Sequence, residues 1–516
     1  MRMTMDQAPS PANHLAKPML HSLELPPFVD PLPLPVRLTP GHRPLRIAMR
    51  EIHAQVHRDV PPTRLWAYTE ASATQHSALA PLIEARTNQA LRIEWINQLP
   101  HQHFLPIDHT LHGCGTYIPD VRCVTHLHGA RVPSQDDGFP TDWFLPGQSR
   151  TCTYPLQQDG ATLWYHDHAM GINRLNTYAG LFGMVLVRDA NEDALNLPSG
   201  PFEIPLTLYD RDFSADGQLF YPVSPYPDRP WVPEFYADAI LINGKINPYL
   251  EVEPRLYRLR ILNAANSRFF ALSVSHDLPL IQIGADQGLL RAPIQLKNIL
   301  LAPAERADIL IDLTHSAGET IHMLNGAAEI LELRVAKGSS STSAPGLASI
   351  PAQLREIPAL AESSAVTTRT ITLNEFPDPA GNPMVMLLNR KRFHEPVTEQ
   401  PRLNTTEIWE FVNQTEDTHP MHLHLVRFQV LDRRQFDTFQ YLMYKKLRFL
   451  GPAISPEPNE LGWKDVVQCP PGFITRIIIH FEGYPGKYLY HCHVLEHEAN
   501  DMMRPFEVLK QHGLED

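Results

Sequence analysis

Cysteine is scarce in this sequence, with five residues in 516. So few thiols cannot form the disulfide scaffold on which small secreted proteins depend. Cys114 and Cys123 bracket a short loop, and two alternatives stay open for them: a local disulfide bridge or two buried free thiols. Cys492 is different because it lies between two histidines. We therefore look for thiol chemistry at Cys492.

The sequence also has no excess of positive charge and no long apolar run. Lysine and arginine total 44 against 57 aspartates and glutamates, a net charge of −13, which argues against nucleic acid or an anionic membrane as the main partner. No apolar run approaches the ~18 residues of a membrane span, and residues 1–20 lack the apolar core of a signal peptide. We expect no nucleic-acid partner, no membrane partner, and synthesis in the cytoplasm without a signal peptide.

Long helical patterns are scarce, whereas turn residues are abundant, with 49 prolines and 26 glycines. Between them lie short alternating stretches such as 90–95 and 257–262, which are typical of strands. We predict an all-β protein, and the chain length suits about three domains of ordinary size. The predicted organisation is an extended arm at 1–44, β domains at 45–196, 197–336 and 368–516, and a linker at 337–367 that contains Gly-Ser-Ser-Ser-Thr-Ser.

Histidine is frequent, with 26 copies, and its spacing is more informative than its number. In a strand, residues i and i+2 face the same side about 6.6 to 6.8 Å apart, so a His-x-His pair offers two imidazoles to neighbouring metal ions. One such pair is commonly a surface feature or half of a zinc site. Four pairs occur here: His126 and His128, His166 and His168, His422 and His424, His491 and His493. They predict one metal cluster where the first and third domains meet, since the second domain has no such pair.

The tripeptide His491-Cys492-His493 is the most informative motif. In a strand its two imidazoles face one side and Cys492 must face the other, so one short segment serves two metal sites. A thiolate, two imidazoles and a weak thioether are the ligand set of a blue-copper electron-transfer centre, here Cys492, His419, His497 and axial Met502. The alternatives are a redox thiol or zinc ligand for Cys492 and a packing role for Met502, beside the adjacent Met503.

The remaining eight histidines are assigned to an oxygen-reducing cluster. His126 and His422 are predicted to hold one mononuclear-like copper. A coupled copper pair takes the six others: His128, His166, His168, His424, His491 and His493.

These motifs resemble those of the multicopper oxidases, in particular the bacterial spore-coat laccase type, with bilirubin oxidase as a near relative. The matching segments are Thr-His-Leu-His-Gly (125–129), Trp-Tyr-His-Asp-His-Ala-Met (164–170), His-Pro-Met-His-Leu-His-Leu (419–425) and His-Cys-His-Val-Leu-Glu-His-Glu (491–498). The likeness covers most of the chain from His57, including Leu-Ala-Pro-Ala-Glu-Arg (301–306) and Met-Met-Arg-Pro (502–505). It implies three cupredoxin-like Greek-key β-sandwich or barrel domains. It also implies four copper ions per chain: one type 1, one type 2 and a type 3 pair.

The chain departs from the family pattern in three places. The usual Gly-Pro-Thr turn is replaced by Ala80-Pro81-Leu82, the second domain has no cysteine, and the loop between His109 and Val124 is this chain's own. These changes bear on substrate preference and stability and leave the copper ligands intact.

The resemblance also implies a reaction cycle. A reducing substrate gives single electrons to the type 1 copper through an exposed edge of His497. Cys492 passes them along its backbone to His491 and His493. After four electrons the trinuclear cluster reduces dioxygen to two waters.

Two carboxylates match the positions that the family uses to deliver protons, Glu498 and Asp137. Asp136 is a further candidate. Without such a role, Glu498 would form a salt bridge and Asp137 would be a turn residue before Gly138.

The substrates that fit this chemistry are small one-electron donors: phenols, aryl amines and bilirubin-like pigments. Three rival functions stay open. A ferrous or manganous oxidase would need only a few surface carboxylates near His497. A non-catalytic coat or assembly protein would not need every ligand, and a copper nitrite reductase would not need paired His-x-His motifs in two distant domains. A monomer suffices because both copper sites lie within one chain, and the spore-coat resemblance allows deposition on a spore or cell surface.

Overall fold

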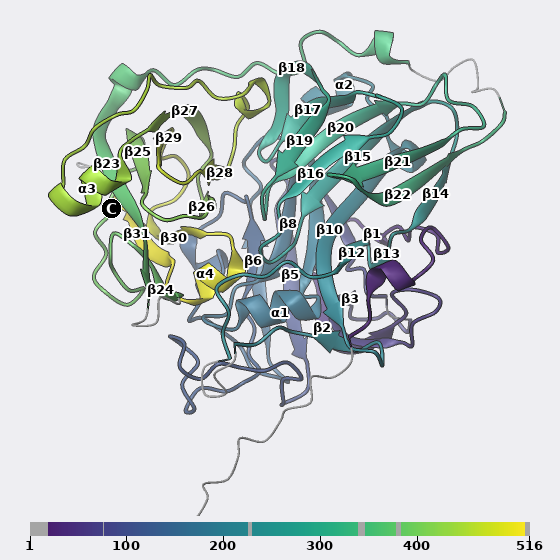
Figure 1. The fold of residues 1–516 in the computed structure, drawn as a ribbon, viewed down its shortest axis with the longest axis horizontal. Helices are drawn as coiled ribbons and strands as arrows, with labels where there is room; N and C mark the ends of the chain where they lie inside the picture. Colours follow the sequence, from purple (N-terminus) through teal and green to yellow (C-terminus); the bar gives the residue numbers. More distant parts are fainter. Residues whose placement is uncertain (1–18, 76, 225–229, 339–345, 378–382, 511–516) are drawn as a thin grey trace, which may run out of the picture.

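The structure is a computed structural model that describes residues 19–510, apart from 76, 225–229, 339–345 and 378–382. Most of the predicted linker run Gly-Ser-Ser-Ser-Thr-Ser therefore lies outside the described residues. The regular structure is mainly β-strand, gathered in six sheets with a few short helices (Figure 1). The all-β prediction is confirmed.

The first block follows the N-terminal arm and contains two sheets, with strand orders β1-β4-β9-β8-β6 and β3-β2-β5-β7. Its elements, with those of the arm, are η1 (Ser22–Glu24), β1 (Arg37–Leu38), β2 (Leu45–Ala54), β3 (Thr63–Glu70), β4 (Leu82–Arg86), β5 (Leu91–Gln98), β6 (Thr125–His128), η2 (Ser134–Asp136), β7 (Ser149–Tyr154), β8 (Ala161–Asp167), α1 (Asn173–Ala179), β9 (Phe182–Arg188) and α2 (Ala190–Ala194).

The second block has an eight-stranded sheet, β13-β12-β10-β15-β20-β17-β18 with β11 beside β10, and a five-stranded sheet, β14-β22-β21-β16-β19. Its elements are η3 (Gly200–Phe202), β10 (Glu203–Phe213), β11 (Leu219–Phe220), β12 (Ala239–Ile242), β13 (Lys245–Ile246), β14 (Tyr249–Val252), β15 (Leu256–Asn263), β16 (Phe270–Val274), β17 (Leu280–Ala285), β18 (Gly288–Leu296), β19 (Asn298–Leu301), β20 (Arg306–Asp312), β21 (Thr320–Asn325) and β22 (Ala328–Val335).

The third block has sheets β24-β23-β25-β29-β27 and β28-β26-β30-β31. Its elements, with those of the preceding connection, are η4 (Leu347–Ser349), η5 (Glu362–Ser364), β23 (Ala365–Pro377), β24 (Pro383–Leu388), β25 (Thr406–Asn413), β26 (His419–Leu423), β27 (Phe428–Gln435), α3 (Thr438–Tyr444), η6 (Pro458–Glu460), β28 (Val466–Cys469), β29 (Phe473–His480), β30 (Gly486–Cys492), α4 (Leu495–Ala499) and β31 (Met503–Val508). β23 begins inside the segment predicted as linker.

One strand arrangement recurs in the three blocks. The first long strand pairs antiparallel with a strand that soon follows it and parallel with a later one: β2 with β3 and β5, β10 with β12 and β15, β23 with β24 and β25. The later strand then pairs antiparallel with β7, β20 or β29. Three copies of one sheet topology are what a chain of repeated β domains predicts, although the exact domain boundaries stay a prediction.

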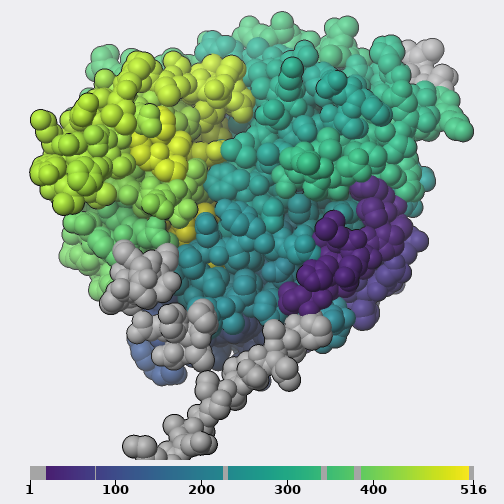
Figure 2. All heavy atoms as spheres, in the orientation of Figure 1, coloured from purple at the N-terminus to yellow at the C-terminus, as the bar shows by residue number. Residues whose placement is uncertain are grey.

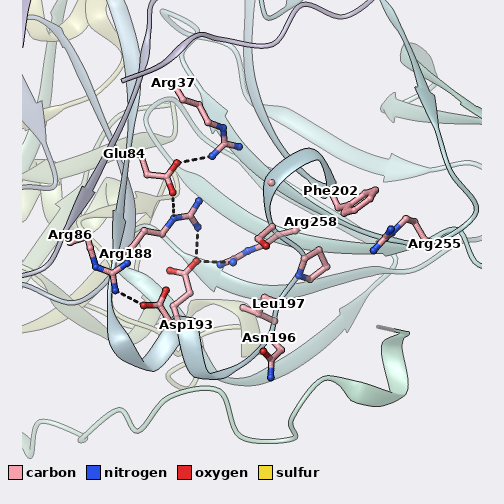
Figure 3. Close-up of a pocket in the computed structure, with 14 residues that line it drawn as sticks. Arg37, Glu84, Arg86, Arg188, Asp193, Asn196, Leu197, Phe202, Arg255 and Arg258 are labelled. Atoms are coloured by element: carbon pink, nitrogen blue, oxygen red, sulfur yellow. Dashed lines mark hydrogen bonds and ion pairs between the residues drawn. The ribbon is translucent and has the colours of Figure 1, made fainter. Parts of the chain in front are cut away.

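A buried ionic cluster joins the first and second blocks. The alternating strand β15 contributes Arg258 and Arg260, whose guanidinium groups bond Glu192 at 2.7 and 2.5 Å. Arg188 of β9 bonds the same carboxylate at 2.8 Å and Glu203 of β10 at 2.5 Å. Figure 3 shows part of this cluster at the edge of a cavity of about 700 Å³. Because each buried charge has a partner, the polar face of β15 can be buried between blocks.

The arm and the connection before β23 both pack on the body. Leu32 of the arm is 6% exposed within the apolar core shared by the first two blocks. In the predicted linker, Leu354 is 2% exposed and its backbone N–H donates to the carbonyl of Arg291. Among the described residues, no helix is both long and apolar enough to cross a membrane.

Candidate metal centres

The predicted ligands come from five elements that lie together between the first and third blocks (Figure 1). β6 and β8 belong to the first block, and β26, β30 and α4 to the third. In the paired strands, His126 is the cross-strand neighbour of His166, and His422 is the neighbour of His491. The other ligands lie in these elements or directly after them: His128, His168, His419, His424, Cys492, His493 and His497.

The eight predicted cluster histidines pack ring against ring across the block interface. The ring centroids of His128 and His422 are 3.6 Å apart, and those of His126 and His424 are 3.8 Å apart. None of the eight side chains is more than 1% exposed: His126, His128, His166, His168, His422, His424, His491 and His493. The four His-x-His pairs therefore converge on one buried volume.

The hydrogen bonds of these rings leave nitrogen atoms free inside the cluster. Nδ1 of His126 lies 2.6 Å from the carbonyl oxygen of Asp137, and Nδ1 of His422 lies 2.8 Å from that of Asp465. The Nε2 atoms of the same two rings are buried and have no partner, as is Nε2 of His166. An unpartnered buried polar atom costs about 1–3 kcal/mol. A metal ion with these nitrogens as ligands would remove that cost, and the backbone contacts would orient the rings.

Burial also keeps these rings in the form that binds metals. It lowers the pKa of His126 to about 3, and it lowers the pKa of His168 and His422 well below the ordinary histidine value. Neutral imidazole is the ligand form. Ligand atoms of three histidines gather within 4.8 Å of one another in several sets, including His168, His424 and His491. The donor set therefore fits more than one closely spaced metal ion.

Cys492 faces a second, smaller site. Its Sγ lies 3.5 Å from Nδ1 of His419 and 3.7 Å from Nδ1 of His497. The adjacent His491 points the other way, with Nε2 3.2 Å from Nε2 of His424. This is the alternation predicted from the tripeptide. Burial raises the pKa of the Cys492 thiol well above its usual value, so a bound cation is what would stabilise a thiolate there.

Met502 and Met503 lie in different apolar clusters. Met502 packs in the cluster that contains Cys492 and Val494, whereas Met503 packs with Leu489 and Met170. The Met502 backbone also brackets the site, because its N–H donates to the carbonyl of His497 and its carbonyl accepts from Cys492 N–H. Of the two methionines, Met502 is the one that lies on the same side of β30 as the Cys492 side chain.

The expected exposed edge of His497 is wrong. The His497 side chain is 0% exposed, and its Nε2 is buried without a hydrogen-bond partner. The indole N–H of Trp231 donates to the carbonyl of the preceding residue, Glu496, at 3.0 Å, and Trp231 packs in the same apolar cluster as Cys492. Tertiary packing therefore buries this ring, and Trp231 of a distant segment binds the backbone beside it, which its own sequence surroundings do not show.

The two predicted carboxylates lie against the histidine cluster. Asp137 Oδ2 is 2.8 Å from Nδ1 of His424, and burial raises the pKa of Asp137 well above its usual value. Glu498 Oε2 is 3.1 Å from Nδ1 of His491, and Glu498 Oε1 accepts from the side-chain amide of Asn173 at 2.6 Å. Asp136 is half-buried, and no contact between it and a predicted ligand is found in the described part of the chain.

Sequence reasoning missed a third carboxylate, Asp465. Its Oδ1 lies 3.2 Å from Nε2 of His128, and its backbone carbonyl contacts His422. Arg306 of the second block binds both of its oxygens. Arg306 ends the segment Leu-Ala-Pro-Ala-Glu-Arg that carried part of the family likeness, but neither residue has a spacing that indicates a role.

The two alternatives for Cys114 and Cys123 are resolved in favour of free thiols, since both are unbridged and buried. Cys123 packs in the core of the first block, while Cys114 accepts a contact from the Arg122 guanidinium at 3.7 Å.

Comparison with known proteins decides the family. The multicopper oxidase family models match residues 118–192 and 362–512. A laccase of Bacillus subtilis (strain 168) is 43% identical, over 94% of this chain and 99% of that protein, and a laccase of Bacillus stratosphericus is 42% identical with the same coverage. This chain belongs to the multicopper oxidases. It is a copper-dependent oxidoreductase of the laccase type that uses dioxygen.

The fold agrees with this family. The crystal structure of a laccase from Pediococcus acidilactici superposes with a TM-score of 0.77 at 26% identity, and the match covers 96% of each chain. The cupredoxin-like architecture that the resemblance implied is therefore confirmed for this multicopper oxidase. The likeness to laccases does not favour the rival metal-ion oxidase and coat-protein functions.

Proposed function

We propose that this multicopper oxidase holds four copper ions and couples one-electron oxidation of small phenolic, aryl-amine or bilirubin-like donors to reduction of dioxygen to water. The type 1 ion is held by His419, Cys492, His497 and Met502, and the type 2 ion by His126 and His422. The type 3 pair is held by His128, His166, His168, His424, His491 and His493. The single observation that best supports this is the position of Cys492 Sγ, which faces His419 and His497 while the adjacent His491 faces the other cluster.

When bound, copper supplies one-electron redox chemistry and dioxygen reduction, which no side chain provides alone. The chain supplies the connection between the sites. The Cys492 side chain and the His491 ring are separated only by bonds of adjacent residues, and Nδ1 of His491 also lies 3.0 Å from the carbonyl oxygen of Cys492. Electron transfer along this short bonded route requires no conformational change.

Glu498 and Asp137 hold the protons that dioxygen reduction consumes. Glu498 has one oxygen toward His491 and the other toward Asn173 and His168, so it can carry a proton at Oε2 while Oε1 stays fixed. Asp137 Oδ1 is buried without a hydrogen-bond partner, and burial raises the pKa of this carboxyl well above its usual value, which favours the protonated form. Glu498 and Asp137 each contact a histidine of the cluster, His491 and His424 respectively.

The buried His497 ring bears on the choice of donor. Because the ring is buried, a donor exchanges electrons across the intervening protein and needs no coordination to the metal. This favours small donors selected by reduction potential and access. A monomer suffices for the whole reaction, and deposition on a spore or cell surface stays a prediction.

Metal analysis with a matched pair of cysteine variants tests the proposal. We expect about four coppers per chain and a strong blue absorption. Cys492→Ser should lose the blue band and the oxygen uptake on a phenol. Cys152→Ser is the control, because Cys152 is also a buried free thiol but packs in the apolar core of the first block. Blue colour retained by Cys492→Ser would contradict the ligand assignment.

A further inference from the structure

The third block carries an apolar surface that the copper chemistry does not use. Between β27 and β28 the chain makes an excursion, residues 436–461, which includes α3 and η6 and is called here the α3 excursion. Its residues 442–450 are all exposed. α3 lies at the outer edge of the third block, away from the second block (Figure 1), and the yellow-green atoms around it form a lobe at that edge (Figure 2).

The exposed side chains of the α3 excursion are mostly large and apolar. Phe439, Met443 and Tyr444 are 61%, 64% and 66% exposed. Six more are exposed beside them: Leu442, Leu447, Phe449, Leu450, Ile454 and Leu461. These nine make up half of the 18 large hydrophobic side chains that the described residues expose. Apolar side chains gathered in this way mark a surface that contacts something else.

The excursion is an ordered structure, so its exposure is not the result of a frayed loop. Phe436, 2% exposed, anchors its start and forms an antiparallel bridge with Phe449. A second bridge joins Arg433 and Ile454. The side chain of Asp437 accepts from the backbone N–H of Gln440 at 3.0 Å and caps α3. The fold therefore presents these apolar side chains at a defined position.

The middle of the excursion is basic, whereas Asp437, Glu457 and Glu460 at its two ends balance the charge over the full 436–461. Residues 438–456 contain Lys445, Lys446 and Arg448 and no acidic residue, in a chain with a net charge of −13. Arg448 contacts Asp437 only at 3.8 Å, and its side chain is 66% exposed. Apolar and aromatic side chains interspersed with lysine and arginine suit the boundary between lipid head groups and acyl chains. The cations complement anionic lipids.

We propose that the α3 excursion docks this enzyme peripherally on an anionic lipid surface. The apolar side chains insert shallowly, and the three cations meet lipid phosphates. The whole-chain charge, which argued against a membrane partner, conceals this local reversal of sign.

A second copy of the chain fits the surface less well. Face-to-face pairing of two excursions would place Lys445, Lys446 and Arg448 against their own copies, and like charges repel. Pairing with another face would need a matching apolar area. The other nine exposed hydrophobic side chains are spread along the described chain between Leu23 and Val366.

Vesicle co-sedimentation of the copper-loaded enzyme tests the proposal. We expect binding to phosphatidylglycerol-containing vesicles, little binding to pure phosphatidylcholine vesicles, and release by high salt, which screens the cations. Lys445→Gln/Lys446→Gln should weaken partitioning roughly thirtyfold. Phe439→Ser/Met443→Ser should weaken it at least as much, because it removes inserted apolar surface.

Matched controls separate docking from folding. Lys297→Gln/Lys487→Gln neutralises two exposed lysines elsewhere and should leave partitioning unchanged. All variants should keep the blue absorption and the phenol oxidase activity. Absence of binding to anionic vesicles would overturn the proposal. So would a dimer by light scattering that Phe439→Ser/Met443→Ser dissociates, or capture by an acidic protein with no lipid binding.

Discussion

Arg306 and Asp465 form a two-point ion pair, with guanidinium nitrogens 2.7 and 2.5 Å from the two carboxylate oxygens and both side chains 0% exposed. Arg306 belongs to the second block, which supplies none of the predicted copper ligands. Asp465 contacts His128 and His422, which come from the other two blocks. The second block is thus connected to the histidine cluster through this ion pair, and Gln287 of the same block also donates to Asp465 at 2.5 Å.

Removing the arginine should therefore disturb the cluster as well as the fold. Arg306→Met leaves a buried carboxylate unpaired, and we expect a loss of about 3–5 kcal/mol of unfolding free energy. The copper content and the type 2 electron paramagnetic resonance signal should fall, while the blue absorption is affected less. Arg46→Met is the control, because its pair with Glu94 is on the surface and should contribute at most about 1 kcal/mol. An unchanged type 2 signal in Arg306→Met would show that other contacts position the rings.

Two glutamates in α4 provide a matched test of proton delivery. Glu498→Gln should lower the turnover number about 10²- to 10⁴-fold, the usual contribution of a positioned acid, with the blue band intact. Glu496 is equally buried, but it bonds Asn266, Ser267 and Tyr221 away from the cluster. Glu496→Gln should therefore lower the melting temperature and change turnover little. Stopped-flow measurement of reoxidation by dioxygen distinguishes them, and equal losses in both variants would argue against the relay.

The two adjacent methionines should respond differently to the same substitution. Met502→Leu should change the blue band and raise the reduction potential of the proposed type 1 site, because a thioether ligand would tune that potential. Met503→Leu should cost less than about 1.5 kcal/mol, as volume-conserving core changes do, and leave the spectrum unchanged. Redox titration of both variants is the measurement. A shifted potential in Met503→Leu alone would reverse the assignment.

The buried ionic cluster between the first two blocks predicts an acid dependence of stability. Burial alone would raise the pKa of Glu192, but Arg260, Arg258 and Arg188 lower it to about 2 from an ordinary value of 4.5. Because the folded pKa is the lower one, this carboxylate stabilises the fold fully above pH 4.5, and the contribution is lost as the pH falls through about 2.

Urea unfolding between pH 7 and pH 2 should show this loss in the native protein. Glu192→Gln should be less stable at pH 7, and its decline should be shallower by up to about 1.4 kcal/mol per pH unit in the acid window. The exposed Glu319→Gln serves as control and should follow the native curve. If the unfolding free energies of the native protein and Glu192→Gln fall in parallel as the pH is lowered, Glu192 is not the source of the acid dependence.

The directions in which the proposed copper ligands point could be predicted because local rules determine them. Strand alternation alone places His491 and Cys492 on opposite sides, and it separates Met502 from Met503 in the same way. The burial of His497 could not be predicted, since it depends on tertiary packing in which Trp231, more than 200 positions away in the sequence, binds the adjoining backbone. The acidic partners of Arg258 and Arg260 could not be predicted either. The alternation of arginine and aliphatic residues identifies β15 as a strand, but it does not show which carboxylates bind the arginines. The α3 excursion, in turn, was hidden by averaging charge over the whole chain.

The division of the eight cluster histidines between two blocks has a consequence for heat inactivation. His419, Cys492, His497 and Met502 all belong to the third block, whereas four of the eight come from the first. If the first and third blocks part while each stays folded, oxygen reduction should stop although the proposed type 1 ligands remain together. Warming should then yield a coloured but inactive enzyme before bleaching begins, and recovery on cooling would require only that two folded parts close again.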